Sequence, residues 1–175
     1  MKRIEMITPG TASPEVEEIF QDIKKSFGMI PNLFKTYAHH PPLLEANWHK
    51  VKRVMMEGAL SRKTKEAIAL LVSKDNGCKY CVAAHSGALK AIGVSDEEIG
   101  LIETDLDQAD FTDKERALVR FSRNANLAAN DVSDEDFLTV REKGASDAEI
   151  IEALGVMEVF TAFNKFLDAL DVELG

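Results

Sequence analysis

Apolar residues recur at helical spacing along most of the chain. Between residues 14 and 27 they fall three or four positions apart, and Ser13 followed by Pro14 is a typical helix start. The same criteria predict further helices over residues 33–38, 41–57, 61–75, 78–92, 95–102, 112–129, 133–143 and 146–170. Because no segment alternates with a period of two, we predict an all-α, single-domain protein with a loosely held N-terminal arm, residues 1–13.

Three of the predicted helices begin with the sequence of a capping box, in which Ser or Thr is followed three residues later by Glu. These boxes span residues 95–98, 112–115 and 146–149. Residues 93–99 also resemble residues 144–150, at an offset of 51 positions. Two explanations stay open: helix caps that look alike, or a duplicated helical unit. In the second case residues 60–102 form the redox-active unit and residues 111–170 form a scaffold.

Composition and charge exclude several classes of protein. The chain has 175 residues, of which 45% are hydrophobic and 29% charged, as expected for one globular domain. Its 21 basic and 30 acidic residues give a net charge of −9 without a basic cluster, so we expect no nucleic-acid or membrane partner. Apolar stretches are far shorter than the ~20 residues of a membrane helix. The N-terminus has no secretory signal, so we expect a cytoplasmic protein.

The chain contains two cysteines, Cys78 and Cys81, which form one C-x-x-C motif. A secreted disulfide scaffold would contain more cysteines at wider spacing, so this pair is expected to serve chemistry. On a helix that begins at Cys78, the side chains of Cys81 and His85 share its face. The helix dipole would favour a thiolate at Cys78. His85, one turn after Cys81, could take the proton of Cys81.

Glu66 lies on the preceding predicted helix and completes the candidate site. A carboxylate there could reach His85 and hold its tautomer. Glu66 could also be a solvated residue beside Lys63 and Lys65, and the cysteines could simply fill core volume. A metal bound by the cysteines, the histidine and the glutamate is a further alternative. Since three ligands on one helical stripe suit a tetrahedral site badly, we expect no metal, and the sequence contains no motif for another cofactor.

This combination resembles the AhpD-like alkylhydroperoxidases of the carboxymuconolactone decarboxylase superfamily. Their signature is a glutamate, a C-x-x-C that begins twelve residues later, and a histidine four residues beyond the second cysteine. The matching residues are Glu66, Cys78, Cys81 and His85. Residues 28–34 and 41–44 look like upstream helices of the peroxidase-related members, so the resemblance covers residues 28–102. It implies an AhpD-like helical bundle that assembles as a homo-oligomer.

The resemblance implies a thiol peroxidase. Cys81 would attack a hydroperoxide and pass through a sulfenic acid, which Cys78 would resolve as a disulfide. An external dithiol, thioredoxin-like or lipoyl-type, would then reduce the disulfide, while His85 and Glu66 relay protons. The helix dipole alone favours Cys78 as the more acidic thiol. Because His85 is closer to Cys81 along the helix and the resemblance agrees, we assign Cys81 as the peroxidatic thiol.

One residue departs from the family pattern. The best-characterised members have a second histidine just before the second cysteine, where this chain has Tyr80. A phenol is a weaker base at neutral pH, so the relay is expected to be incomplete, and Tyr80 either contacts the substrate or packs. Two alternatives to a peroxidase stay open: a different thiol–disulfide oxidoreductase, and a redox-sensing binding protein. Lactone decarboxylation is disfavoured, since the decarboxylase branch lacks the cysteine pair.

Three features outside the motif have a structural interpretation. The His39–His40 pair is expected to lie in a surface turn. Trp48 is expected in the core or at a subunit interface. The apolar final helix, which carries Phe160, Phe163 and Phe166, is expected to be a central core helix or to face another subunit.

Overall fold

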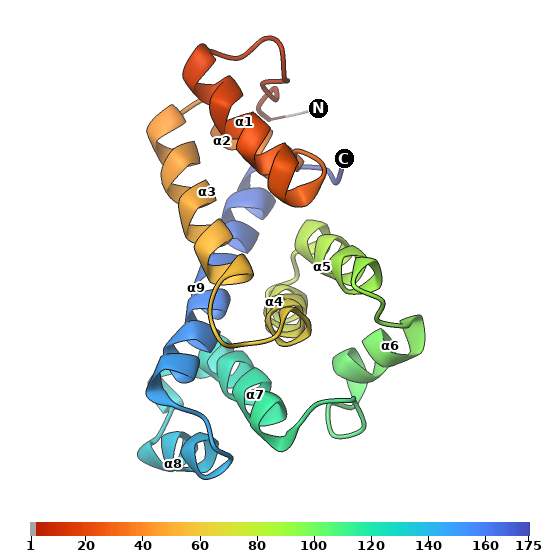
Figure 1. Ribbon diagram of the computed structural model, residues 1–175, viewed down its shortest axis with the longest axis vertical. Coiled ribbons are helices and arrows are strands. Elements are labelled where there is room, and N and C mark those ends of the chain that lie inside the picture. Colours follow the sequence, from red (N-terminus) through yellow and green to blue (C-terminus); the bar gives the residue numbers. More distant parts are fainter. Residues whose placement is uncertain (1–2) are drawn as a thin grey trace.

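The structure, a computed structural model, describes residues 3–175, and every regular element in that range is a helix (Figure 1). The α-helices are α1 (Pro14–Phe27), α2 (Asn32–Tyr37), α3 (Pro41–Met56), α4 (Arg62–Asp75), α5 (Lys79–Ala91), α6 (Asp96–Thr104), α7 (Asp113–Ala128), α8 (Asp134–Glu142) and α9 (Asp147–Leu170). A 3₁₀ turn, η1 (Ala129–Asp131), follows α7. The all-α prediction is confirmed. No helix within the described residues is both long and apolar enough to cross a membrane.

Most helices start where the sequence predicts, because the capping signals are local. The capping boxes at residues 112–115 and 146–149 are complete. The box predicted at Ser95 is only half formed. The Ser95 hydroxyl accepts a hydrogen bond from the backbone N–H of Glu98. The Glu98 carboxylate, however, binds Lys63 Nζ of α4 at 2.8 Å instead of the backbone N–H of Ser95. A tertiary ion pair therefore replaces the local contact, and it ties α6 to α4.

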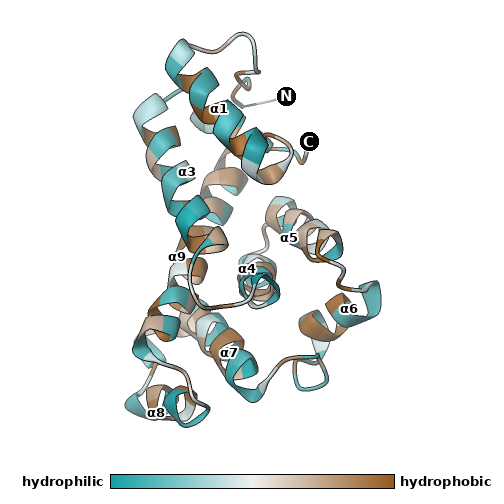
Figure 2. Cartoon of the chain, in the orientation of Figure 1, coloured by the Kyte–Doolittle hydropathy of each residue, from teal (hydrophilic) through white to brown (hydrophobic). Residues whose placement is uncertain are grey.

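Helix α4 lies at the centre of the fold. Its side chains from Thr64 to Ser73 are all buried, and Figure 1 shows it nearly end-on, surrounded by α5, α6, α7 and α9. Figure 2 shows that α6 and α7 each have a hydrophilic and a hydrophobic side, as expected for helices between core and solvent. Helix α9 packs on α3, α4, α5 and α7. Since Phe160 and Phe163 are buried, α9 is a central core helix.

Helices α1, α2 and α3 form a layer at one end of the molecule (Figure 1). Trp48 of α3 is buried here, and its indole N–H donates to Asp22 of α1 at 2.7 Å. Its ring also packs edge-on against Phe34 of α2. These contacts place Trp48 in the core of the chain itself.

The N-terminal arm is held more firmly than predicted. The backbone N–H of Ile7 donates to the carbonyl oxygen of Lys35, and His39 Nε2 lies 2.6 Å from the carbonyl oxygen of Glu5. The first two residues of the arm lie outside the described part. The neighbouring His40 is exposed, and its ring accepts a hydrogen bond from the N–H of Leu43 at the start of α3. The predicted surface turn is confirmed, with a capping role for His40.

Helix boundaries recur at the offset of the internal repeat. Helices α4 and α7 begin at residues 62 and 113, and α6 and α9 begin at residues 96 and 147. The ends of α5 and α8, residues 91 and 142, also differ by 51. This recurrence is what a duplicated three-helix unit requires, and duplication stays a prediction.

Candidate active site

The structure brings Glu66 of α4 and His85 of α5 together in the core. Glu66 Oε2 lies 2.6 Å from His85 Nδ1. The two residues are only 1% and 7% exposed, so Glu66 is not a solvated surface residue. The second carboxylate oxygen, Oε1, accepts a hydrogen bond from the Arg62 guanidinium at 2.7 Å. Both oxygens of Glu66 are thus engaged, which fixes the orientation of the carboxylate.

The surroundings of Glu66 keep it ionised at neutral pH. Burial disfavours its charge, but the hydrogen bond and charge of His85, together with Arg62, outweigh burial and lower the pKa of Glu66 below its ordinary 4.5. An ionised carboxylate can only accept a hydrogen bond, so His85 Nδ1 carries a proton. Nε2 of His85 is then the ring atom that can accept or return a proton. The Phe160 ring of α9 packs edge-on against the imidazole, with 4.2 Å between ring centroids.

Both cysteines lie at the start of α5, as predicted. Cys78 is the N-cap residue, and Cys81 and His85 lie on the buried face of the helix. The thiols are free and buried, with 0% and 4% exposure for Cys78 and Cys81. The structure therefore gathers Glu66, Cys78, Cys81 and His85 where α4 and α5 pack together, which is the constellation that the spacing indicated.

The two thiols differ in acidity. Interaction with the Cys81 thiol lowers the pKa of Cys78, against the effect of burial, and the Cys81 backbone N–H lowers it further. The same pairing, together with burial, strongly raises the pKa of Cys81. Cys78 is thus the thiol that ionises first in the resting protein, as the helix dipole predicts. The role of Cys81 as peroxidatic thiol stays a prediction, and it requires a base that acts on Cys81.

The hydroxyl of Tyr80 is bound to helix α2. Its hydroxyl oxygen accepts a hydrogen bond from the backbone N–H of Leu33, at the start of α2, at 3.2 Å. Burial raises the pKa of Tyr80, so the phenol stays protonated at neutral pH. This geometry favours the packing interpretation, in which Tyr80 fastens α5 to α2.

Within residues 3–175, no group of three or more His, Cys, Asp or Glu side chains is arranged to hold a metal ion. A cavity of about 260 Å³ lies between α7 and α8, where Arg116, Phe121, Asp136 and Lys143 are among its lining residues. None of the four candidate site residues lines this cavity.

Comparison with known proteins assigns the chain to a family. Residues 41–124 match the model of the Carboxymuconolactone decarboxylase family, a span that contains all four candidate residues. The chain belongs to the carboxymuconolactone decarboxylase family. It is 30% identical to the solved alkylhydroperoxidase AhpD core from Rhodospirillum rubrum, with a TM-score of 0.51 over 77% of this chain and 98% of that one.

Other proteins similar to this member of the carboxymuconolactone decarboxylase family are named for different activities. An alkyl hydroperoxide reductase of Mycobacterium tuberculosis is 28% identical over 102 residues, which are 58% of this chain and 30% of that protein. The chain thus spans less than a third of that relative. A peroxidase-related protein from Silicibacter sp. TM1040 has a TM-score of 0.88 at 23% identity, over 99% and 92% of the two chains. The debrominase Bmp8, solved with 2,3,4-tribromopyrrole, has a TM-score of 0.83 at 21% identity, over 100% and 94%.

Two polar residues near the thiols of this family member were missed by the sequence analysis. Asn164 of α9 is completely buried, and Asp168 follows one turn later and is exposed. Asn164 is a neighbour of Cys81, and Asp168 is a neighbour of Cys78, whose pKa its carboxylate raises. The sequence did contain a signal for Asn164. It follows Phe160 by four positions and therefore places a polar side chain on the apolar face of the final helix.

Proposed function

We propose that this protein is a thiol-dependent peroxidase that reduces hydroperoxides through Cys78 and Cys81. The observation that carries the proposal is a buried hydrogen bond from His85 to Glu66 of α4. His85 lies on α5, the same helix that carries the two free thiols. A carboxylate that fixes a histidine one turn from a thiol is the usual arrangement of an activated nucleophile. The names of the Mycobacterium tuberculosis relative and of the Silicibacter structure support hydroperoxide chemistry.

The first half of the proposed cycle oxidises Cys81. His85 Nε2 takes the proton of the Cys81 thiol, and the thiolate attacks one oxygen of the hydroperoxide. The S–O bond forms as the O–O bond breaks, and the departing alkoxide takes the proton from His85 and leaves as an alcohol. Cys81 is then a sulfenic acid, oxidised by two electrons, and Glu66 has kept the imidazole in one orientation throughout.

The second half uses the acidity of Cys78. The Cys78 sulfur attacks the Cys81 sulfur, an S–S bond forms, and the hydroxyl of the sulfenic acid leaves as water with the proton of Cys78. The lowered pKa of Cys78 suits this step, because the thiolate is the attacking species. An external dithiol, thioredoxin-like or lipoyl-type, then reduces the disulfide by two exchange steps and returns both protons.

The test is a coupled assay in which dithiothreitol serves as the dithiol and tert-butyl hydroperoxide as the substrate. We expect the wild-type protein to consume both in a ratio of one to one, and Cys81→Ser to lose this activity. Cys78→Ser should complete a single oxidation of Cys81 without forming the intramolecular disulfide. Peroxide consumption by the wild type no faster than in a protein-free control would overturn the proposal.

The likeness to the debrominase Bmp8 supports a second candidate reaction for the same thiols. Here the two thiols would supply two electrons and a proton to a carbon–bromine bond, which releases bromide, leaves a C–H bond and yields the same disulfide. Bromide release from 2,3,4-tribromopyrrole in the presence of dithiothreitol measures this reaction. Bromide release without peroxide consumption would replace the first candidate with the second.

A further inference from the structure

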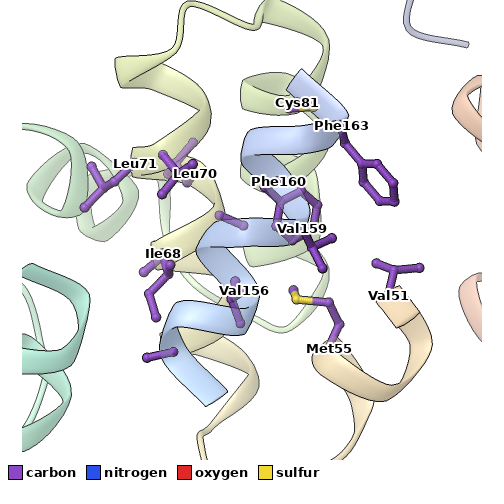
Figure 3. Packing of buried hydrophobic residues seen from close by; sticks show 14 of the residues in the cluster. Val51, Met55, Ile68, Leu70, Leu71, Cys81, Val156, Val159, Phe160 and Phe163 are labelled. Atoms are coloured by element: carbon purple, nitrogen blue, oxygen red, sulfur yellow. The ribbon is translucent and has the colours of Figure 1, made fainter. Parts of the chain in front are cut away.

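Helices α5 and α9 pack with residues paired at one-turn intervals. The first pair is His85 with Phe160, whose rings are in edge-on contact. One turn earlier in α5 is Cys81, and one turn later in α9 is Asn164, its neighbour. Two helices that pass in opposite directions with equal rise per turn repeat their contacts in this way. Figure 3 shows Cys81 beside the part of α9 that carries Phe160 and Phe163. Helix α9, in the carboxyl-terminal half of the chain, thus packs beside the thiols.

The side chain of Asn164 is fixed by hydrogen bonds from α4 and its following turn. Its Nδ2 donates to Ser73 Oγ at 3.0 Å, and its Oδ1 accepts from Asn76 Nδ2 at 3.0 Å. Asn76 is held in turn by hydrogen bonds with Asn126 in both directions, at 3.2 and 3.0 Å. A flip of the Asn164 amide would set its Nδ2 against the Nδ2 of Asn76, so the bond with Asn76 fixes the orientation, whereas the Ser73 hydroxyl could pair with either end of the amide.

This orientation leaves one donor of Asn164 for the sulfur. An amide nitrogen carries two N–H groups, and Ser73 accepts only one of them. Asn164 is 0% exposed, so its second N–H has no access to solvent, and Cys81 lies beside the same side chain. A buried donor is costly to leave without a partner, by about 1–3 kcal/mol.

Cys81 needs such a donor. Burial and the adjacent Cys78 both disfavour a negative charge on its sulfur, whereas Asn164 favours it. We propose that Asn164 donates its second N–H to the Cys81 sulfur and stabilises the thiolate that attacks the substrate. A neutral amide can do this without the cost of a second buried charge. The inference deepens the proposed peroxidase function and rests on it for its role in turnover, but the contact with sulfur is testable without any peroxide.

The experiment measures alkylation of each cysteine by iodoacetamide as a function of pH. Trypsin cleaves after Lys74, Lys79 and Lys90, so Cys78 and Cys81 fall in separate peptides that mass spectrometry quantifies independently. Asn164→Ala should slow Cys81 alkylation at a given pH by about tenfold or more, the equivalent of one pKa unit. Alkylation of Cys78 should change much less.

Asn126→Ala is the matched control. It removes amide hydrogen bonds to Asn76 and Thr161 in the same network but no neighbour of the sulfur, so Cys81 alkylation should stay close to wild type. Ser73→Ala provides a second variant if Asn164→Ala does not fold. It removes one hydrogen bond that positions the Asn164 amide, so it should slow Cys81 alkylation by a smaller factor. Equal effects of Asn164→Ala and Asn126→Ala, or no effect of Asn164→Ala and Ser73→Ala, would overturn the inference.

The two proposals fail separately in this design. If Cys81 is alkylated more slowly in Asn164→Ala but the wild type consumes no peroxide, the proposed peroxidase function is refuted and the Asn164 contact still holds. Normal Cys81 alkylation in Asn164→Ala, combined with active wild type, would refute the Asn164 contact alone.

Discussion

Glu66 and His85 are nineteen residues apart in the sequence, yet their side chains share a 2.6 Å hydrogen bond in the core. The connection between α4 and α5 makes this possible. Gly77 adopts a φ of +78°, a conformation that side chains other than glycine's rarely adopt, and the chain reverses there between the two helices. The reversal lets the first turns of α4 reach the middle of α5, and the carboxylate meets the imidazole.

The first prediction concerns the charge of Glu66. Its pKa is lowered in the folded protein, so it contributes stability that is fully present above its ordinary value of 4.5 and is lost as the pH falls through the folded value. Glu66→Gln keeps the side-chain volume but removes the charge, and should lower the free energy of unfolding by about 1–3 kcal/mol at pH 7. Urea unfolding of both proteins at pH 7 and pH 3.5 checks this, because the difference should shrink at the lower pH. A difference independent of pH would contradict it.

The same variant should also slow peroxide turnover. With a neutral partner, His85 loses the carboxylate that fixes its tautomer, and general acid–base catalysis contributes about 10²–10⁴-fold to such reactions. The coupled dithiothreitol assay measures the loss, and Lys63→Gln is a control because Lys63 pairs with Glu98 rather than with Glu66. Wild-type turnover in Glu66→Gln would show that Glu66 takes no part in proton transfer.

The second prediction concerns the Asp168 carboxylate beside Cys78. This carboxylate raises the pKa of Cys78, so Asp168→Asn should lower that pKa and speed alkylation of Cys78 at pH 7. Because Asp168 is exposed, the gain should fall as salt is added and screens the charge in the wild type. Asp171→Asn, one turn further along, is the control and should leave Cys78 unchanged.

The third prediction tests the interpretation of Tyr80. Tyr80→Phe removes the acceptor for the Leu33 N–H and should destabilise the protein by about 0.5–1.5 kcal/mol. Turnover should stay at the wild-type level, since the Tyr80 hydroxyl is bound to the backbone of α2 and the relay consists of Glu66 and His85. A large loss of activity with unchanged stability would instead assign Tyr80 to the relay or to substrate binding.

The fourth prediction concerns a buried ion pair away from the thiols. Lys65 Nζ lies 2.7 Å from Glu152 Oε1 and donates to the carbonyl oxygen of Val54, so one lysine joins α3, α4 and α9. Lys65→Ala removes the lysine partner of Glu152, which keeps its hydrogen bonds from the backbone N–H groups of Ala59 and Leu60, and should cost about 1–3 kcal/mol in urea unfolding. Alkylation rates of both cysteines in the folded variant should match wild type, which separates this network from the redox site.

The sequence predicts what is encoded locally. Ser61, Thr112 and Ser146 cap their helices through contacts that span three residues, so the helix starts follow from short motifs. The face shared by Cys81 and His85 likewise follows from helical spacing alone. The half-formed box at Ser95 shows the limit, because Lys63 lies outside that window and captures the carboxylate of Glu98.

The contribution of α9 could not be predicted in this way. Asn164 is bound to Ser73 across 91 positions of sequence, and spacing rules give no information about contacts of that range. The sequence analysis also favoured Cys81 over Cys78 because His85 is nearer to it, whereas in the structure Cys78 is the more acidic thiol. The order of the two pKa values is decided by the mutual contact of the sulfurs and by burial, both of which depend on how α5 packs on the rest of the fold.

The most direct test of the peroxidase account is the intact mass of the reduced protein before and after one equivalent of tert-butyl hydroperoxide. We expect the wild type to lose two hydrogens as a Cys78–Cys81 disulfide, and Cys78→Ser to gain one oxygen as a sulfenic acid on Cys81, trapped by dimedone. Thiols that stay reduced while the hydroperoxide survives would contradict the account.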